Sequence, residues 1–165
     1  MSSAASDVYK RQDLSYAYLA GFTEESLKFA AIYFYIRKKT DFDEPMDAIV
    51  YGTLISLGFA TLENFQYVYN AGNPDFIAIL RSFTAIPLHA CCGIIMGYYF
   101  GLYIFKDRNK LNLFKSLFFA ISFHATYNYF ATRNVLLMFI VLIILISFAR
   151  KLHKLLKIEQ LSKQD

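Results

Sequence analysis

Long apolar runs alternate with short polar connections along almost the whole chain. About 20 mostly apolar residues are needed for a helix to cross a bilayer, so runs of this length predict membrane helices. The predicted spans are residues 14–36, 46–69, 83–105, 111–130 and 135–149. The pattern therefore predicts an all-α fold, a polytopic transmembrane helical bundle with about five membrane helices in this chain.

The connection between the second and third runs carries signals of its own. Gly72, Asn73 and Pro74 in succession are typical of a turn. Residues 75–81 are expected to form a short interfacial helix after that turn. Pro87, at the start of the third run, is expected to kink or open its helix and leave room for water.

Composition supports the membrane interpretation. Hydrophobic residues make up 56% of the chain and charged residues 18%, whereas soluble domains carry about 25% charged residues. The net charge of +4 does not indicate nucleic-acid binding, because the basic residues sit at the ends of apolar runs, as topology signals do. The expected surroundings are the lipid bilayer, with no nucleic-acid partner.

Basic-rich and basic-poor connections alternate along the chain. The basic-rich ones carry Arg37, Lys38 and Lys39; then Lys106, Arg108, Lys110 and Lys115; and, in the tail, Arg150, Lys151, Lys154, Lys157 and Lys163. The two others carry only Arg81 and Arg133. The positive-inside rule then predicts that the basic loops and the C-terminal tail lie in the cytoplasm.

Three segments are expected along the chain. Residues 1–12 are interpreted as a non-native or disordered leader, because DVYKRQ within them resembles the translation of a transposase end used in sequencing libraries. Residues 13–150 form the transmembrane bundle, and residues 151–165 form the basic cytoplasmic tail. We expect the chain to be an N-terminally truncated fragment that lacks upstream helices.

Ionisable residues occur inside the predicted spans, where each costs about 2.5–3.5 kcal/mol on insertion scales. Glu24, Glu25 and Lys28 lie in the first span, at spacings that let Lys28 reach either carboxylate. One glutamate is then left free to take and return a proton. A structural ion pair that holds two helices together is an equally good interpretation of these residues alone.

The second span carries Glu63 and Asn64. Glu63 shares one helix face with Phe59 and Tyr67 and has no nearby basic residue in its own helix. It therefore needs a partner from another helix, a proton or a metal. The alternative is a location near the membrane surface at the end of the span.

Two histidines lie within the third and fourth spans. His89 begins a stripe that continues with Gly93, Gly97 and Gly101, and small residues at this spacing let membrane helices approach closely. His89 is therefore expected to face the bundle core. A lone histidine there is more often a buried hydrogen-bonding residue than a ligand.

His124 and Asn128 share one face of the fourth span. The histidine could act as a base, a ligand or a donor to an oxyanion. The asparagine could orient the ring or donate to the same oxyanion. Hydrogen bonding between helices is the alternative.

The motifs EESLK (24–28), GFATLEN (58–64), His89 and HATYN (124–128) together resemble the PrsW family of intramembrane proteases, related to the CAAX and bacteriocin-processing proteases. The resemblance covers roughly residues 16–130. It implies a bacterial cytoplasmic-membrane enzyme that cleaves a membrane-associated or lipid-associated peptide substrate, as in site-1 cleavage of an anti-sigma factor. The family usually has more helices than five.

The expected mechanism is hydrolysis by an activated water with a stabilised oxyanion. Glu25 assisted by His89 is expected to activate the water, and Glu24 to pair with Lys28 or share the proton. His124 and Asn128 are expected to stabilise the oxyanion or protonate the leaving amine, while Glu63 orients a histidine. Asn64, next to Glu63 in the sequence, is expected to be a supporting residue of the site.

A metal-dependent version of this mechanism uses the same residues. Glu63, His89 and His124 are suitable ligands for one divalent metal such as zinc, with an open position for water. The HExxH signature of many zinc proteases is absent from the sequence. The spacing does not separate this version from a glutamate-based one.

Two non-enzymatic classes compete with the protease. A proton- or cation-coupled transporter also places Glu, Lys and His inside its helices, but it typically contains inverted repeats, and no repeat is evident here. A scaffold that binds other membrane helices would tolerate conservative changes such as Glu24→Gln.

Overall fold

The computed structural model describes residues 14–162, and the predicted leader at 1–12 lies outside this range. All regular structure in the described range is helical, which confirms the predicted all-α bundle. The long helices are α2 (Leu14–Ala30), α3 (Pro45–Tyr69), α5 (Ala85–Leu102), α6 (Lys110–Ala131) and α7 (Val135–Leu161), with the shorter α4 (Pro74–Phe83) before α5. Short π and 3-10 segments continue two helices: η1 (Ala31–Tyr35) and η2 (Ile36–Lys38) after α2, and η3 (Tyr103–Asp107) after α5.

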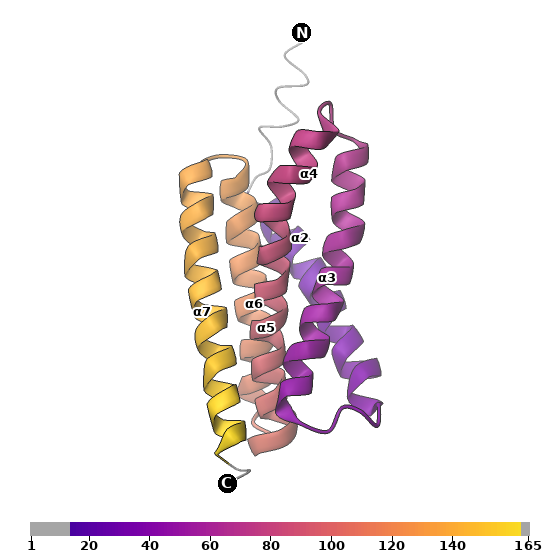
Figure 1. The fold of residues 1–165 in the computed structure, drawn as a ribbon, viewed down its shortest axis with the longest axis vertical. Helices are drawn as coiled ribbons and strands as arrows, with labels where there is room; N and C mark the ends of the chain where they lie inside the picture. Colours follow the sequence, from indigo (N-terminus) through magenta and orange to yellow (C-terminus); the bar gives the residue numbers. More distant parts are fainter. Residues whose placement is uncertain (1–13, 163–165) are drawn as a thin grey trace.

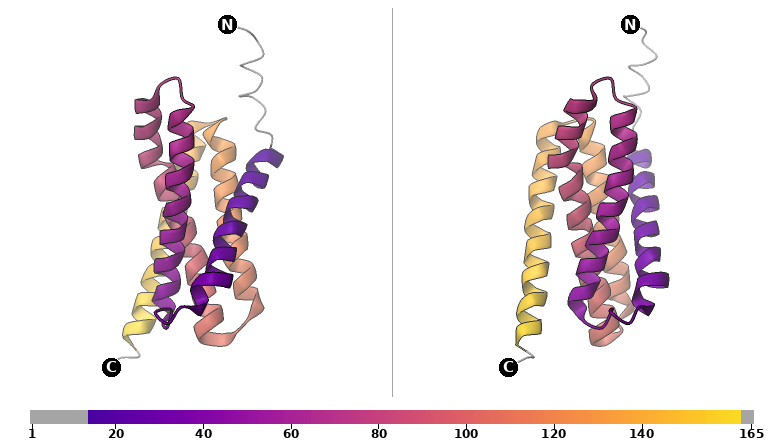
Figure 2. Two further views of the ribbon diagram at one scale, coloured as in Figure 1. Left: turned by 90° about the vertical axis from the view of Figure 1, so that its right-hand side faces the viewer. Right: turned by 45° about the vertical axis from the view of Figure 1, so that its right-hand side comes forward.

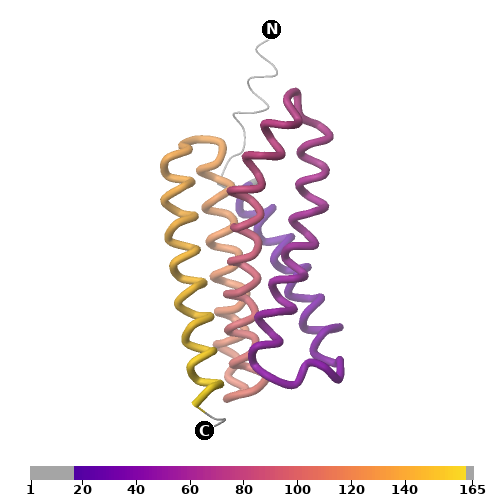
Figure 3. The backbone as a smooth tube through the Cα atoms, in the orientation of Figure 1, coloured from indigo at the N-terminus to yellow at the C-terminus, as the bar shows by residue number. Residues whose placement is uncertain are grey.

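The helices run up and down around α5, which packs against α3, α6 and α7 (Figure 1). α2 packs mainly on α6, and Figure 2 shows α2 and α3 diverging toward the N-terminal end. The backbone trace places connections 36–44 and 107–109 and the C-terminus at one end of the bundle (Figure 3). The basic-rich connections thus share one end, as the charge alternation predicts.

Three helical stretches are long and apolar enough to cross a membrane: Pro45–Tyr69, Pro74–Asp107 and Val135–Leu161. α2 and α6, predicted as spans as well, are helical in the expected places but fall short of that standard of length and composition. Much of the outer surface is apolar, and Leu19, Leu62 and Ile143 are each at least 60% exposed. An exposed apolar surface of this extent suits a lipid environment.

The predicted glycine stripe forms the closest helix contact of the bundle. An added Cβ on Gly93 would lie 2.6 Å from the carbonyl oxygen of Gly52. One on Gly97 would lie 2.6 Å from the Cα of Ile49 and still closer to the carbonyl oxygen of Ala48. The backbones of α3 and α5 therefore touch directly, as small residues allow in membrane bundles.

The helix is interrupted near Pro87, as expected. α4 ends at Phe83, whose carbonyl Pro87 cannot bond because it lacks an N–H, and Thr84 leaves the helical conformation. Pro87 itself occupies the first turn of α5, which is continuous from Ala85 to Leu102. The helix predicted at residues 75–81 is α4, and it runs nearly in line with α5 (Figure 1).

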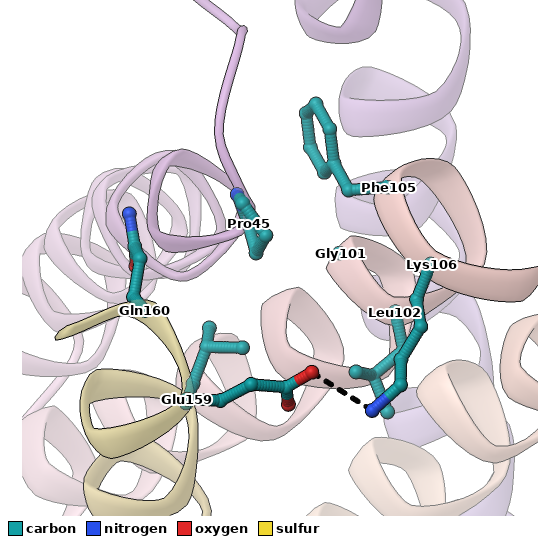
Figure 4. Close-up of a pocket in the computed structure, with 8 residues that line it drawn as sticks. Pro45, Gly101, Leu102, Phe105, Lys106, Glu159 and Gln160 are labelled. Atoms are coloured by element: carbon teal, nitrogen blue, oxygen red, sulfur yellow. Dashed lines mark hydrogen bonds and ion pairs between the residues drawn. The ribbon is translucent and has the colours of Figure 1, made fainter. Parts of the chain in front are cut away.

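The fifth membrane helix extends far into the predicted tail. α7 continues past Ala149 to Leu161, and Leu152 and Leu156 are buried against the bundle. A small pocket lies beside this extension (Figure 4), lined by Pro45, Gly101, Leu102, Phe105, Lys106, Leu156, Glu159 and Gln160. The ion pair between Lys106 and Glu159, at 2.9 Å, ties η3 to α7 there.

Gly97→Ala should destabilise the bundle by about 1–3 kcal/mol, because the new methyl group meets backbone that cannot give way. Gly58→Ala is the matched control, since a Cβ on Gly58 meets nothing within 4 Å and alanine favours a helix. Thermal unfolding midpoints in detergent micelles would test the pair. Equal midpoints for the two variants would contradict the close contact of α3 and α5.

Candidate active site

Polar side chains from four helices meet in the half of the bundle away from the C-terminus. They are Glu24, Glu25 and Lys28 of α2, Glu63 of α3, His89 of α5 and His124 of α6. Because neighbouring helices alternate in direction, the late turns of α3 and α6 lie level with the first turns of α5. The up-and-down topology therefore assembles the cluster.

Lys28 lies at the centre of the cluster and is fully buried. Its ammonium donates to Glu25 Oε1 at 2.7 Å and to His89 Nδ1 at 2.8 Å, and it lies 3.7 Å from Glu24 Oε2. The ring of Phe59 lies beneath the ammonium at 5.5 Å from its centroid. The predicted reach of Lys28 to both carboxylates is thus present, with Glu25 the closer partner.

Glu63 is held by two cationic or polar neighbours from other elements. Its Oε2 accepts from Arg81 Nη2 at 2.6 Å and from His89 Nε2 at 2.9 Å. The neighbouring Asn64 accepts from Arg81 Nε at 2.6 Å. Glu63 therefore has partners from other helices: Arg81 of α4 and His89 of α5.

The donors around the two histidines indicate their tautomers. Lys28 can only donate, so His89 Nδ1 accepts and its Nε2–H donates to Glu63. His124 Nδ1 lies 2.7 Å from Glu25 Oε1, so it carries the proton and donates to that carboxylate. The Nε2 of His124 is then left with a free lone pair.

Three buried atoms in the cluster have no hydrogen-bond partner in the described part of the chain: Glu24 Oε2, Glu25 Oε2 and His124 Nε2. The rings of His89 and His124 stand edge to face with centroids 4.9 Å apart. Buried polar atoms are normally satisfied, so unpartnered ones mark a place for water, an ion or a substrate. Glu24 and His124 therefore present reactive lone pairs at this site.

The cluster fits a divalent metal. Glu24, His89 and His124 each offer one ligand atom, and these atoms lie within 4.8 Å of one another. Carboxylate oxygen and imidazole nitrogen are ligands that catalytic zinc accepts. Glu25 fixes the ring of His124 through its other nitrogen, as carboxylates do for metal-binding histidines. His89 would have to exchange one of its two hydrogen bonds to coordinate.

The structure pairs the predicted site residues differently from the expectation. Glu25 contacts His124 rather than His89. Glu63 contacts a histidine, as expected, and that histidine is His89. The group that could hold a metal contains Glu24 in the place expected for Glu63. Asn128 lies half-buried in α6, one turn after His124.

Arg81 was missed as a site residue by the sequence reasoning, which counted it among the topology charges. A single arginine in the otherwise apolar stretch PDFIAILRSF was the available signal. Its guanidinium also stacks 3.9 Å from the ring centroid of Tyr67. On the predicted face of Phe59, Glu63 and Tyr67, Phe59 contacts Lys28, Glu63 contacts His89 and Arg81, and the more exposed Tyr67 contacts Arg81.

Residues 2–150 of the sequence match the model of the PrsW family of intramembrane metalloproteases. The chain belongs to this family. The resemblance inferred from the four motifs is confirmed, and the PrsW-family chain is an integral membrane protein. The family's metalloprotease description agrees with a metal site built from Glu and His.

Curated proteins named Protease PrsW are similar to this PrsW-family chain. The protein from Geobacillus kaustophilus is 37% identical over 111 residues, covering 67% of this chain and 48% of its own. That from Bacillus subtilis is 38% identical over 115 residues (68% and 52%), and that from Clostridioides difficile 31% over 116 residues (67% and 49%). The chain spans about half the length of the curated relatives it matches. No solved structure matches it.

Lys28→Met should destabilise the PrsW-family bundle by about 3–5 kcal/mol, because Glu25 stays buried without its cation. Lys106→Met is the matched control: it also removes a lysine from an ion pair, but that lysine side chain is 55% exposed, and the loss should stay below about 1 kcal/mol. Unfolding midpoints in micelles would compare the two. A control as damaging as Lys28→Met would contradict the central place of Lys28.

Proposed function

We propose that this protein hydrolyses a peptide bond of a membrane-associated protein substrate at the Glu and His cluster. One observation carries the proposal: the buried atoms Glu24 Oε2 and His124 Nε2 have no hydrogen-bond partner among residues 14–162, and the two residues offer ligand atoms within 4.8 Å of each other. Family membership supports the reaction class, since the family is one of intramembrane metalloproteases. Peptide hydrolysis needs a group that accepts a proton from water, and both atoms can do so.

Within this proposal, Glu24 and His124 orient the attacking water and take up its proton. Glu25 is a positioning residue that accepts the Nδ1–H of His124 and so directs the free Nε2 toward the water. Lys28 balances the charge of the buried carboxylates. The half-buried amide of Asn128 is free to donate to the developing oxyanion.

In a metal-dependent version of the reaction, Glu24, His89 and His124 would instead hold a divalent metal such as zinc, and Glu24 and His124 would then be ligands rather than proton acceptors. When bound, the metal supplies Lewis acidity that activates the water and polarises the scissile carbonyl. The low dielectric of the bundle strengthens each of these interactions relative to water. Glu63 then acts through His89, whose Nε2–H it accepts.

The position of the cluster supports a substrate cut on the outer side of the membrane. The basic-rich connections lie at the opposite end of the bundle, and we assign that end to the cytoplasm by the positive-inside rule. Glu63, His89 and His124 then lie toward the outer face. A membrane-anchored anti-sigma factor cleaved at its outer juxtamembrane segment fits this geometry.

Glu24→Gln and His124→Gln should each lower cleavage by at least about 100-fold, because each removes a proton acceptor from the water. The assay is cleavage of a tagged, membrane-anchored anti-sigma factor by the intact protein in proteoliposomes. Glu159→Gln, at the other end of the bundle, is the matched control and should cleave normally. Normal cleavage by both site variants would refute the assignment, and proton flux without cleavage would favour a transporter.

Glu63→Gln should weaken zinc binding by about 10–100-fold, as loss of a group that orients a ligand does, and Glu24→Gln should weaken it more because it removes a ligand. Zinc content after dialysis against a graded chelator series would measure this in purified protein. The pair decides whether Glu24 or Glu63 is the carboxylate ligand. Full cleavage after exhaustive chelation would instead rule out a metal-dependent reaction.

A further inference from the structure

Arg81 makes three directed contacts with one neighbouring helix. Its Nη2 donates to Glu63 at 2.6 Å, its Nε donates to Asn64 at 2.6 Å, and its guanidinium plane lies 3.9 Å from the ring centroid of Tyr67. These three partners all belong to α3, whereas Arg81 belongs to α4. A planar guanidinium engaged by two acceptors and one ring face has little freedom to rotate.

The contact with Glu63 leads directly into the reactive cluster. The same oxygen, Glu63 Oε2, accepts from both Arg81 Nη2 and His89 Nε2. The Arg81 side chain is only 14% exposed and that of Glu63 18%, so water competes little for these hydrogen bonds. The direction in which Glu63 presents Oε2 to His89 therefore depends on Arg81.

His89 is hydrogen-bonded at both of its ring nitrogens. Its Nδ1 accepts from Lys28, and its Nε2–H has Glu63 as acceptor. If Glu63 rotates away, the Nε2–H is left unpaired in a side chain that is 1% exposed. Leaving a buried donor unsatisfied costs free energy, so the ring would reorient or change tautomer.

We propose that Arg81 is a positioning residue of the site: it holds Glu63 in the orientation that receives the Nε2–H of His89. Arg81 touches neither Glu24 nor His124 and acts only through Glu63. The contacts of Arg81 also make the α3–α4 hairpin part of the site, because they join the end of α4 to the late turns of α3. The effect on cleavage rests on the proposed peptidase function, whereas the effect on His89 does not.

The structural arm of the test uses the imidazole ¹⁵N spectrum of His89 in the intact purified protein, assigned by comparison with His89→Gln. Arg81→Ala should shift the His89 Nε2 signal away from that of a hydrogen-bonded N–H, and Arg81→Lys should shift it less. Arg133→Ala is the matched control, because Arg133 also stacks on a tyrosine, Tyr129, at 4.6 Å. An unchanged His89 spectrum in folded Arg81→Ala protein would overturn the proposal.

The kinetic arm uses a quenched fluorogenic peptide that covers the outer juxtamembrane segment of a membrane-anchored anti-sigma factor. Arg81→Ala should lower kcat by about 10–100-fold, as loss of a residue that orients a site histidine does, with little change in KM. Millimolar guanidinium chloride should restore part of kcat in Arg81→Ala and none in Arg133→Ala. A rise in KM alone, or no rescue, would indicate a role in substrate binding or stability instead.

Two further measurements keep the arms separate. Glu24→Gln is assayed in parallel: if it cleaves normally, the proposed peptidase site fails while the His89 spectrum still tests Arg81. Unfolding midpoints show whether Arg81→Ala has lost its fold. If Arg81→Ala is unfolded, Arg81→Lys tests the proposal, because lysine keeps the charge but cannot donate to Glu63 and Asn64 in the same geometry. A wild-type His89 spectrum and a wild-type kcat in Arg81→Lys would overturn the proposal.

Discussion

The structure depends on the burial of Lys28 together with Glu25 at the centre of a helical bundle in a membrane. Both side chains are completely excluded from solvent, and such a charge is tolerated only when partners surround it. The ammonium donates to Glu25 and His89, and Glu25 Oε1 accepts from both Lys28 and His124. Three helices are thereby tied to a single cation, which sets where α2, α5 and α6 meet.

The close backbone contact between α3 and α5 allows the polar residues of the two helices to meet. The glycines of α5 let α3 approach until its backbone touches theirs, and this brings Glu63 to His89. A bulkier residue at Gly93 or Gly97 would push α3 outward and stretch that hydrogen bond. Packing by small residues and polar pairing therefore act together, since neither lipid nor apolar side chains draw membrane helices together strongly.

The site combines completed and incomplete hydrogen bonding. Arg81, Glu63, His89, Lys28 and Glu25 form a continuous chain of donors and acceptors. Within residues 14–162, Glu24 Oε2, Glu25 Oε2 and His124 Nε2 have no hydrogen-bond partner. The completed part holds the rings still, and the incomplete part is where chemistry can occur. An arrangement of this kind is pre-organised, because the orienting groups need not move when a substrate arrives.

The sequence by itself determined the helical class, the places of the long helices, the stripe of glycines and the identity of the buried ionisable residues. Each follows from local patterns: apolar length, a spacing of four, and the cost of a charge in lipid. Only the tertiary structure decided which carboxylate meets which histidine, that Glu24 rather than Glu63 joins the potential ligand group, and that Arg81 belongs to the site. These depend on the rotation and level of separate helices relative to one another, and spacing within one helix carries no information about either.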